Sequence, residues 1–187
     1  LTVIVQYRPE NLRSVGSIVS WTQMLMGWPL DVVVNAAKSG EYTRAALANI
    51  NELLSFRPQL VIMHALGIND QSYLYPDNPT NFVTEVETMA NNRAIFDAIL
   101  ASGADLIVGT ITPVGSAETA RAKKDIMDRV IRLNDDIWRY ARGKARMQVY
   151  DSYGAYIDPT NATGLAFANT MRVDGIHHSM RGALRLA

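Results

Sequence analysis

Short runs of apolar residues alternate along this chain with longer segments in which apolar residues recur every three or four positions. The short runs are continuous and rich in β-branched residues, which is typical of parallel strands covered on both faces. Five such runs are Leu1–Val5, Asp31–Val34, Gln59–Ala65, Leu106–Ile111 and Met147–Tyr150. They predict a mainly parallel five-stranded sheet.

The segments between these runs predict helices. The apolar positions that define them are Trp21, Leu25 and Met26; Leu47, Ile50 and Leu54; Val86, Met89, Phe96 and Ile99; and Ile126, Val130, Leu133 and Ile137, with Trp138 fitting the core pattern of the last helix. Helix-terminating residues follow their ends at Gly27, Pro58, Gly103 and Gly143. Strands that alternate with helices predict an α/β fold, a three-layer α/β/α sandwich.

Two segments lack either period and are predicted to be loops. Gln71–Asn81 is polar and contains Pro, and its Tyr73 and Tyr75 could stack on a sugar at the rim of a pocket or pack within the loop itself. Asp151–Arg172 is long and irregular, and loops of that length in compact domains are usually functional or mobile.

Composition narrows the class of protein. The 187 residues favour a single domain, 1–187, and an apolar start without Met together with a helix-like end leads us to expect trimming at both ends. Lys plus Arg equal Asp plus Glu at 18 each, which gives no electrostatic case for nucleic acid. The absence of cysteine excludes a thiol nucleophile. No apolar run reaches the roughly 18 residues that a membrane span needs.

Asp174 and His177 are the strongest candidates for chemistry. A catalytic imidazole needs a carboxylate on one ring nitrogen and a nucleophile on the other, so Asp174 would orient His177 and His177 would carry the proton. An ordinary surface loop would also accommodate this spacing. A metal site that combines the pair with His178 and Asp70 is disfavoured because adjacent histidines rarely face one ion, and we predict neither metal nor cofactor.

Two further features follow predicted strands. Gly67 permits a sharp turn after the third strand, and the side chain of Asn69, next to Asp70, could donate to an oxyanion there. Gly40 follows the second strand, where a helix that begins in this region would present backbone N–H groups to an anion. Strand ends of a parallel sheet meet at one edge, so an amide donor, a backbone donor and an acid–base pair could converge.

These blocks resemble those of the SGNH/GDSL hydrolase family over nearly the whole chain. Gly40 lies in a segment similar to the second block, Gly67, Asn69 and Asp70 match the third, and Asp174 and His177 match the last. The resemblance implies the SGNH/flavodoxin-like sandwich, ester hydrolysis, oxyanion donation by Asn69 and Gly40, and roles for His177 and Asp174 as base and orienter.

The chain departs from the family at the nucleophile. Where Gly-Asp-Ser is expected after the first strand, the chain has Gln6-Tyr7-Arg8, so Tyr7 occupies the place of the serine. Ser17 is an alternative nucleophile, although it is better placed to cap the helix near Trp21.

We therefore expect a hydrolase of carboxylic esters, with O-acetylated carbohydrate as a plausible substrate and no nucleic-acid partner. A ligand- or carbohydrate-binding module that lacks the nucleophile is the alternative. The pattern is compatible with a monomer or a dimer.

Overall fold

The computed structural model describes residues 36, 40–63, 66–72, 83–113 and 120–157. The predicted strands Leu1–Val5 and Asp31–Val34, and the helix predicted around Trp21, lie outside these residues. None of the helices in the described ranges is long and apolar enough to cross a membrane.

Three parallel strands form the sheet of the described residues, in the order β1 (Leu60–Met63), β2 (Asp105–Gly109) and β3 (Met147–Tyr150). Leu60 lies opposite Asp105, and Leu106 lies opposite Met147. All three strands were predicted from their apolar runs, and the predicted α/β fold with a parallel sheet is confirmed.

Strand β2 ends at Gly109, whereas the apolar run Leu106–Ile111 predicted that it would continue to Ile111. Thr110 still donates its N–H to the carbonyl of Tyr150 at 3.0 Å, outside the bounds of β2. The next N–H, that of Ile111, instead donates to the side-chain oxygen of Asn134 at 2.7 Å, and the Asn134 amide donates back to the Ile111 carbonyl at 3.0 Å. Asn134 therefore replaces the neighbouring strand as the partner of this residue.

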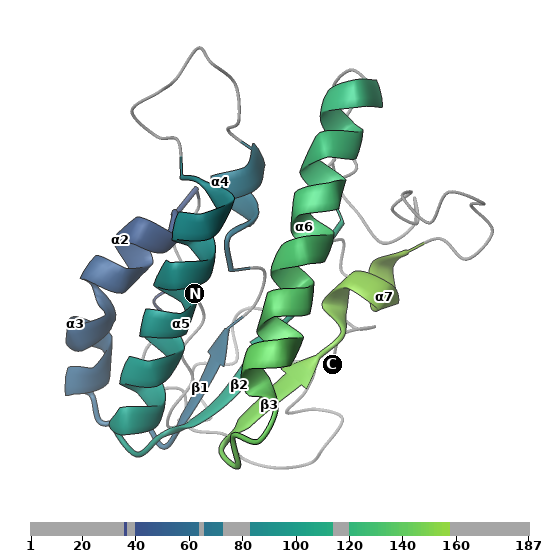
Figure 1. Cartoon of the computed structure of the whole chain (residues 1–187). Coiled ribbons are helices and arrows are strands. Elements are labelled where there is room, and N and C mark those ends of the chain that lie inside the picture. Colours follow the sequence, from purple (N-terminus) through teal and green to yellow (C-terminus); the bar gives the residue numbers. More distant parts are fainter. Residues whose placement is uncertain (1–35, 37–39, 64–65, 73–82, 114–119, 158–187) are drawn as a thin grey trace, which may run out of the picture.

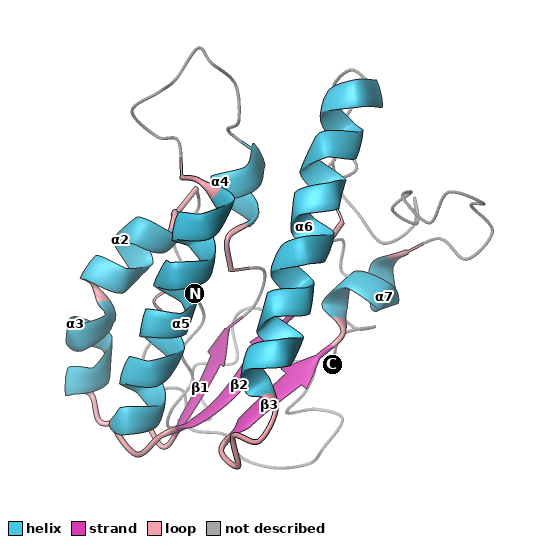
Figure 2. Ribbon diagram, viewed as in Figure 1, coloured by secondary structure: helices cyan, strands magenta, loops and turns pink. Residues whose placement is uncertain are grey.

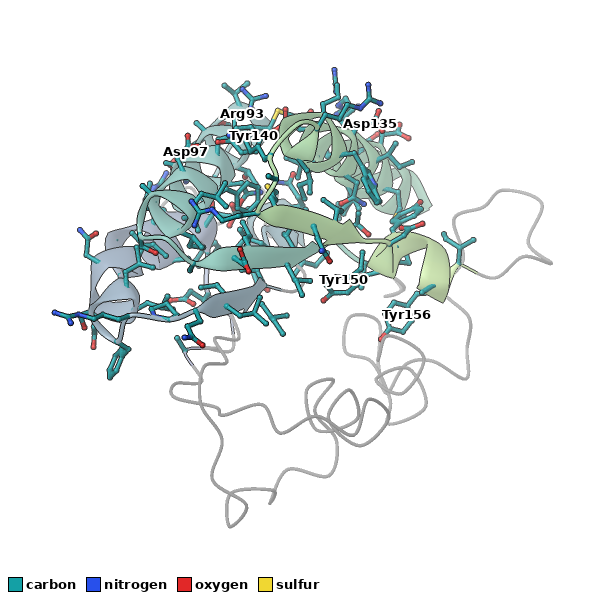
Figure 3. The ribbon with its side chains drawn as sticks, turned by 90° about the horizontal axis from the view of Figure 1, so that it is seen from below. Arg93, Asp97, Asp135, Tyr140, Tyr150 and Tyr156 are labelled. Carbon is teal, nitrogen blue, oxygen red and sulfur yellow. The ribbon has the colours of Figure 1, made fainter. Side chains whose placement is uncertain are left out.

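Helices α5 (Glu85–Ala101) and α6 (Ala120–Ala141) lie on the same face of the sheet, as Figure 3 shows. This arrangement follows from the right-handed connection of consecutive parallel strands, which puts successive crossover helices on one side. The short helices α2 (Thr43–Ala48) and α3 (Ile50–Ser55) lie beside α5, on its side away from α6 (Figures 1 and 2).

Helix ends agree with the sequence in most places. The N-cap of α5 is Thr84, whose hydroxyl accepts the N–H of Glu87 at 3.1 Å, and its C-terminal end is followed by Gly103 with φ 96°. One prediction was wrong: the apolar pattern from Leu47 to Leu54 forms two helices, because Asn49, with ψ 0°, interrupts the α-helical backbone between them.

The two segments predicted to be loops each begin with a helix, which corrects the prediction. Helix α4 (Ile68–Ser72) extends into the segment that starts at Gln71, and α7 (Ser152–Tyr156) lies within the segment that starts at Asp151. Polar residues disfavour helices when they compete with the backbone, but here Asp151 caps α7 by accepting the N–H of Gly154 at 2.9 Å. The polar side chains of α4 likewise find buried partners.

The core lies between the sheet and the two long helices. Alternate strand residues are fully buried, together with the apolar stripes of α5 and α6. Main members are Val61, Met63, Leu106, Val108, Ile95, Phe96, Ile99, Val130, Leu133 and Ile137.

Two residues that were assigned to the apolar pattern of these helices are exposed instead. Val86 lies in the first turn of α5 with 77% of its surface exposed, and Trp138 on α6 is 42% exposed. Trp138 directly follows the buried Ile137, and successive residues of a helix point about 100° apart, so only one of the two can face the sheet.

Paired arginine and glutamate side chains join α5 to its neighbours on both sides. Arg44 of α2 donates to both carboxylate oxygens of Glu87 at 2.7 and 2.9 Å, and Arg132 of α6 donates to both oxygens of Glu85 at 2.7 Å. Exposed ion pairs contribute little to stability because solvent screens them, so packing rather than charge holds the helices to the sheet.

We expect Ile99→Ala to lower the free energy of unfolding by about 2–5 kcal/mol, because Ile99 is fully buried and its truncation leaves a cavity. Val86→Ala in the same helix is the matched control and should change stability by less than about 0.5 kcal/mol, since Val86 is exposed. Urea unfolding followed by circular dichroism measures both. Equal losses for the two variants would contradict the assignment of the core.

Candidate active site

The turn after β1 depends on glycine at position 67. Gly67 has φ 97°, a conformation that other residues adopt only with strain, and it immediately precedes α4. A Cβ atom there would lie 2.9 Å from the Thr88 methyl carbon, which is closer than atoms in contact normally approach. Both conditions require glycine, which allows α4 to begin close to α5.

Asp70 on α4 is fully buried and is surrounded by hydrogen-bond donors. Its carboxylate accepts the backbone N–H of Thr43 at 3.0 Å, the hydroxyl of Thr88 at 2.8 Å, and the hydroxyl of Thr43. Burial raises the pKa of the Asp70 carboxyl above its ordinary value of 3.8, although the three hydrogen bonds act in the opposite direction. Within the described part of the chain, no three acidic or histidine residues cluster so as to hold a metal ion.

The side chain of Asn69 points to the segment that precedes α2. Its amide nitrogen donates to the backbone carbonyl of Glu41 at 2.9 Å. Glu41 directly follows Gly40, which has φ 71° and is exposed. Two of the predicted site residues, Asn69 and Gly40, are thereby brought to neighbouring positions although they are far apart in sequence.

The helix that follows Gly40 begins later than the sequence prediction assumed. Its N-cap is Tyr42 and its first residue is Thr43, so Gly40 lies two residues before the cap and outside the helix. The prediction that Gly40 presents its N–H at the N-terminus of a helix is therefore wrong. What Gly40 contributes is a left-handed turn, which glycine adopts without strain.

Sequence reasoning missed the threonines that complete this site. Thr43 and Thr88 are fully buried and bind Asp70, and the Asn91 side chain donates to the Thr43 hydroxyl at 3.1 Å. One signal was present: Thr88, Asn91 and Asn92 are polar residues on the buried face of α5, between Val83 and Ile95. Polar residues in a core position require partners, so they could have indicated a buried network.

The carboxyl ends of β2 and β3 lie at the same edge of the sheet as the end of β1, and their side chains are closely packed. A Cβ atom on Gly109 would lie 2.5 Å from the Tyr150 ring, so only glycine at this position leaves room for that ring. The Thr110 hydroxyl accepts the N–H of Tyr153 at 2.8 Å and so fixes the start of α7. Figure 3 shows Tyr150 and Tyr156 on the side of the sheet opposite α5 and α6, and burial raises the pKa of both phenols.

The remaining predicted site residues lie outside the described residues. They are the acid–base pair Asp174 and His177, Tyr7 at the nucleophile position, its alternative Ser17, and also His178, Tyr73 and Tyr75. Their roles stay predictions.

In parallel α/β sheets, ligand sites form beyond the carboxyl ends of the strands, and Gly67, Asn69 and Asp70 follow the carboxyl end of β1. The chain belongs to the GDSL-like lipase/acylhydrolase family, which it matches over residues 6–184. Membership confirms the family resemblance seen in the sequence and identifies the class as acyl ester hydrolases. No match was found among curated protein sequences.

Solved structures with the same fold include proteins named as an acetylxylan esterase and a GDSL-like lipase. An acetylxylan esterase from Geobacillus stearothermophilus is 18% identical, with a TM-score of 0.68 over 91% of this chain and 75% of that one. A GDSL-like lipase from Bacteroides thetaiotaomicron is 20% identical, with a TM-score of 0.64 over 79% of this chain and 68% of that one. At such identities the likeness shows a shared fold.

We expect Gly67→Ala to destabilise the protein more than Gly103→Ala. The two glycines have nearly the same φ, 97° and 96°, but a Cβ atom at Gly103 would meet no atom within 4 Å. The shared cost of a left-handed alanine is about 1 kcal/mol, and the crowding against Thr88 adds about 1–3 kcal/mol at position 67 alone. Denaturant unfolding of both variants measures the difference, and equal losses would contradict the close approach of α4 to α5.

The raised pKa of Asp70 predicts a pH dependence of stability. A carboxyl whose pKa is higher in the folded state favours folding most below its unfolded pKa, and that contribution is lost as the pH rises through the folded pKa. Relative to Asp70→Asn, which does not titrate, the natural protein should therefore lose stability as the pH increases upward from about 3.8. Urea unfolding of both proteins between about pH 3 and pH 7 tests this, and a relative gain with rising pH would refute it.

Proposed function

We propose that this chain hydrolyses carboxylic esters, and that its substrates are acetyl esters of carbohydrates. Family membership supports ester hydrolysis. The acetyl carbohydrate is supported by the likeness to an acetylxylan esterase and by the aromatic residues Tyr73 and Tyr75 in the segment after α4. Neither metal nor cofactor is needed for this reaction.

The observation that carries the proposal is the hydrogen bond from Asn69 to the Glu41 carbonyl. It joins the Asn69 amide to Glu41, the residue that follows Gly40, and Asn69 itself follows the carboxyl end of β1. The bond to Glu41 sets the plane of the Asn69 amide. We assign the Asn69 side chain and the Gly40 N–H to the carbonyl oxygen of the substrate.

The reaction would proceed in two steps. A nucleophilic hydroxyl attacks the ester carbonyl as its proton passes to His177, which Asp174 orients, and the negative oxygen is held by Asn69 and Gly40. His177 then returns the proton to the departing alcohol. Water attacks the acyl group in the same way and releases the acid.

The identity of the nucleophile favours a second candidate function. Tyr7 stands where the family has serine, and a phenol ring there would occupy the space of the acyl group. Under this alternative the chain binds carbohydrate or another ligand through the same polar groups without cleaving it. Ser17 is the candidate nucleophile if the chain is active.

Turnover of an aryl acetate and of acetylated xylooligosaccharide by the purified chain separates the two functions. We expect His177→Ala to lower kcat by at least about 100-fold, because the general base is lost. His178→Ala is the matched control, since it removes the adjacent imidazole, and it should retain activity.

A fluorophosphonate reagent, which labels activated serines, then locates the nucleophile by peptide mass spectrometry. Labelling of Ser17 that is lost in His177→Ala supports the active enzyme. A rate equal to buffer for the natural protein, no labelling, and activity gained in Tyr7→Ser would support the binding module instead.

A further inference from the structure

We propose that Thr43, Asp70 and Thr88 form a buried positioning network that holds the Gly40–Thr43 backbone against Asn69 and so sets the separation of the two oxyanion donors. This inference rests on the proposed function for its catalytic consequence. We call the hold of this network on the Gly40–Thr43 backbone the clamp. The clamp involves only described residues and can be tested without measuring enzyme activity.

Two consecutive residues of α4 hold the segment from Gly40 to Thr43 at two points. Asn69 donates to the carbonyl of Glu41 at 2.9 Å, and Asp70 accepts the N–H of Thr43 at 3.0 Å. Bonds at positions 41 and 43 fix both the distance and the rotation of this short backbone segment. Gly40 immediately precedes Glu41, so we infer that these two bonds also limit the movement of the Gly40 backbone.

Asp70 also performs the capping that α2 lacks within its own sequence. The N-cap residue Tyr42 makes no side-chain capping bond. The carboxylate of Asp70, 27 residues later in the chain, accepts both the N–H and the hydroxyl of the first helical residue, Thr43. Negative charge near a helix N-terminus is favourable, so the position of α2 depends on a residue of α4.

Thr88 connects Asp70 and Thr43 to the long helix α5 through hydrogen bonds. Its hydroxyl donates to Asp70 at 2.8 Å and accepts the Gln71 amide at 3.2 Å, while the Thr43 hydroxyl accepts the Asn91 amide at 3.1 Å. Each threonine hydroxyl therefore gives its proton to Asp70 and receives one from an amide. An amide N–H can only donate, so the bonds from Gln71 and Asn91 leave each threonine hydroxyl to donate its proton to Asp70.

The hydrogen-bond network leaves one buried polar atom of Gln71 without a partner among the described residues. Its amide nitrogen is used by Thr88, and its buried oxygen has no hydrogen-bond partner among the described residues. Leaving a buried acceptor unpaired is unfavourable, so the gain at Asp70 and Thr88 outweighs it. Such an ordered network, which reaches the chain three residues after Gly40 at Thr43, is what preorganised oxyanion donors require.

The test compares Thr88→Val, which removes the hydroxyl but keeps the shape, with Thr88→Ser, which keeps the hydroxyl. Thr84→Val is the matched control, because it removes a capping hydroxyl from the same helix without contact to Asp70. We expect Thr88→Val to lower kcat by about 10- to 100-fold with little change in KM, since a misplaced donor affects the transition state most. Thr88→Ser should restore kcat, and Thr84→Val should leave it unchanged.

Amide hydrogen exchange at Thr43 supplies the readout that does not need activity. The exchange rate should rise in Thr88→Val, stay near the natural value in Thr88→Ser, and stay unchanged in Thr84→Val. Unchanged Thr43 exchange in Thr88→Val overturns the clamp. Faster exchange with a natural kcat overturns its catalytic role and leaves the proposed function standing. Absence of turnover in the natural protein refutes the proposed function, and with it the catalytic role, while Thr43 exchange still decides the clamp.

Discussion

The buried carboxylate of Asp70 is the constraint on which the arrangement of this site depends. A fully buried acid is costly unless donors surround it, and here the donors come from two different helices. Thr43 brings the start of α2, and Thr88 brings α5. Gly67 makes the arrangement possible, because any larger residue would push α4 away from Thr88. The hydrogen bonds of Asp70 therefore determine both how α2, α4 and α5 pack and where the candidate oxyanion donors lie.

The parallel sheet explains why distant sequence blocks meet. Each strand delivers its following residues to the same edge, and the crossover helices α5 and α6 cover one face. Helix α4, which follows β1, supplies Asn69 and Asp70. The ends of β2 and β3 pack closely around Gly109 and Tyr150. Membership of the GDSL-like lipase/acylhydrolase family accords with chemistry at such an edge.

Much of the fold could be predicted from the sequence, and the failures have physical reasons. Continuous apolar runs identified β1, β2 and β3, because strands of a parallel sheet are buried along their length. Helices α4 and α7 were missed since their polar residues favour loops locally. Tertiary partners such as Thr43 reverse that preference for α4, and the side chain of Asp151 caps α7. For the site, the motif pointed to Asn69 and Asp70, but no local pattern could show that Thr88 approaches them from a separate helix.

The central claim is that Asn69 and Gly40 together hold the oxygen of an ester undergoing attack. A crystal structure of the chain with a tetrahedral phosphonate or boronate analogue tests it most directly. We predict that the Asn69 amide nitrogen and the Gly40 backbone nitrogen both lie within about 3.1 Å of one oxygen of the analogue. An analogue whose oxygens contact neither nitrogen would contradict the account.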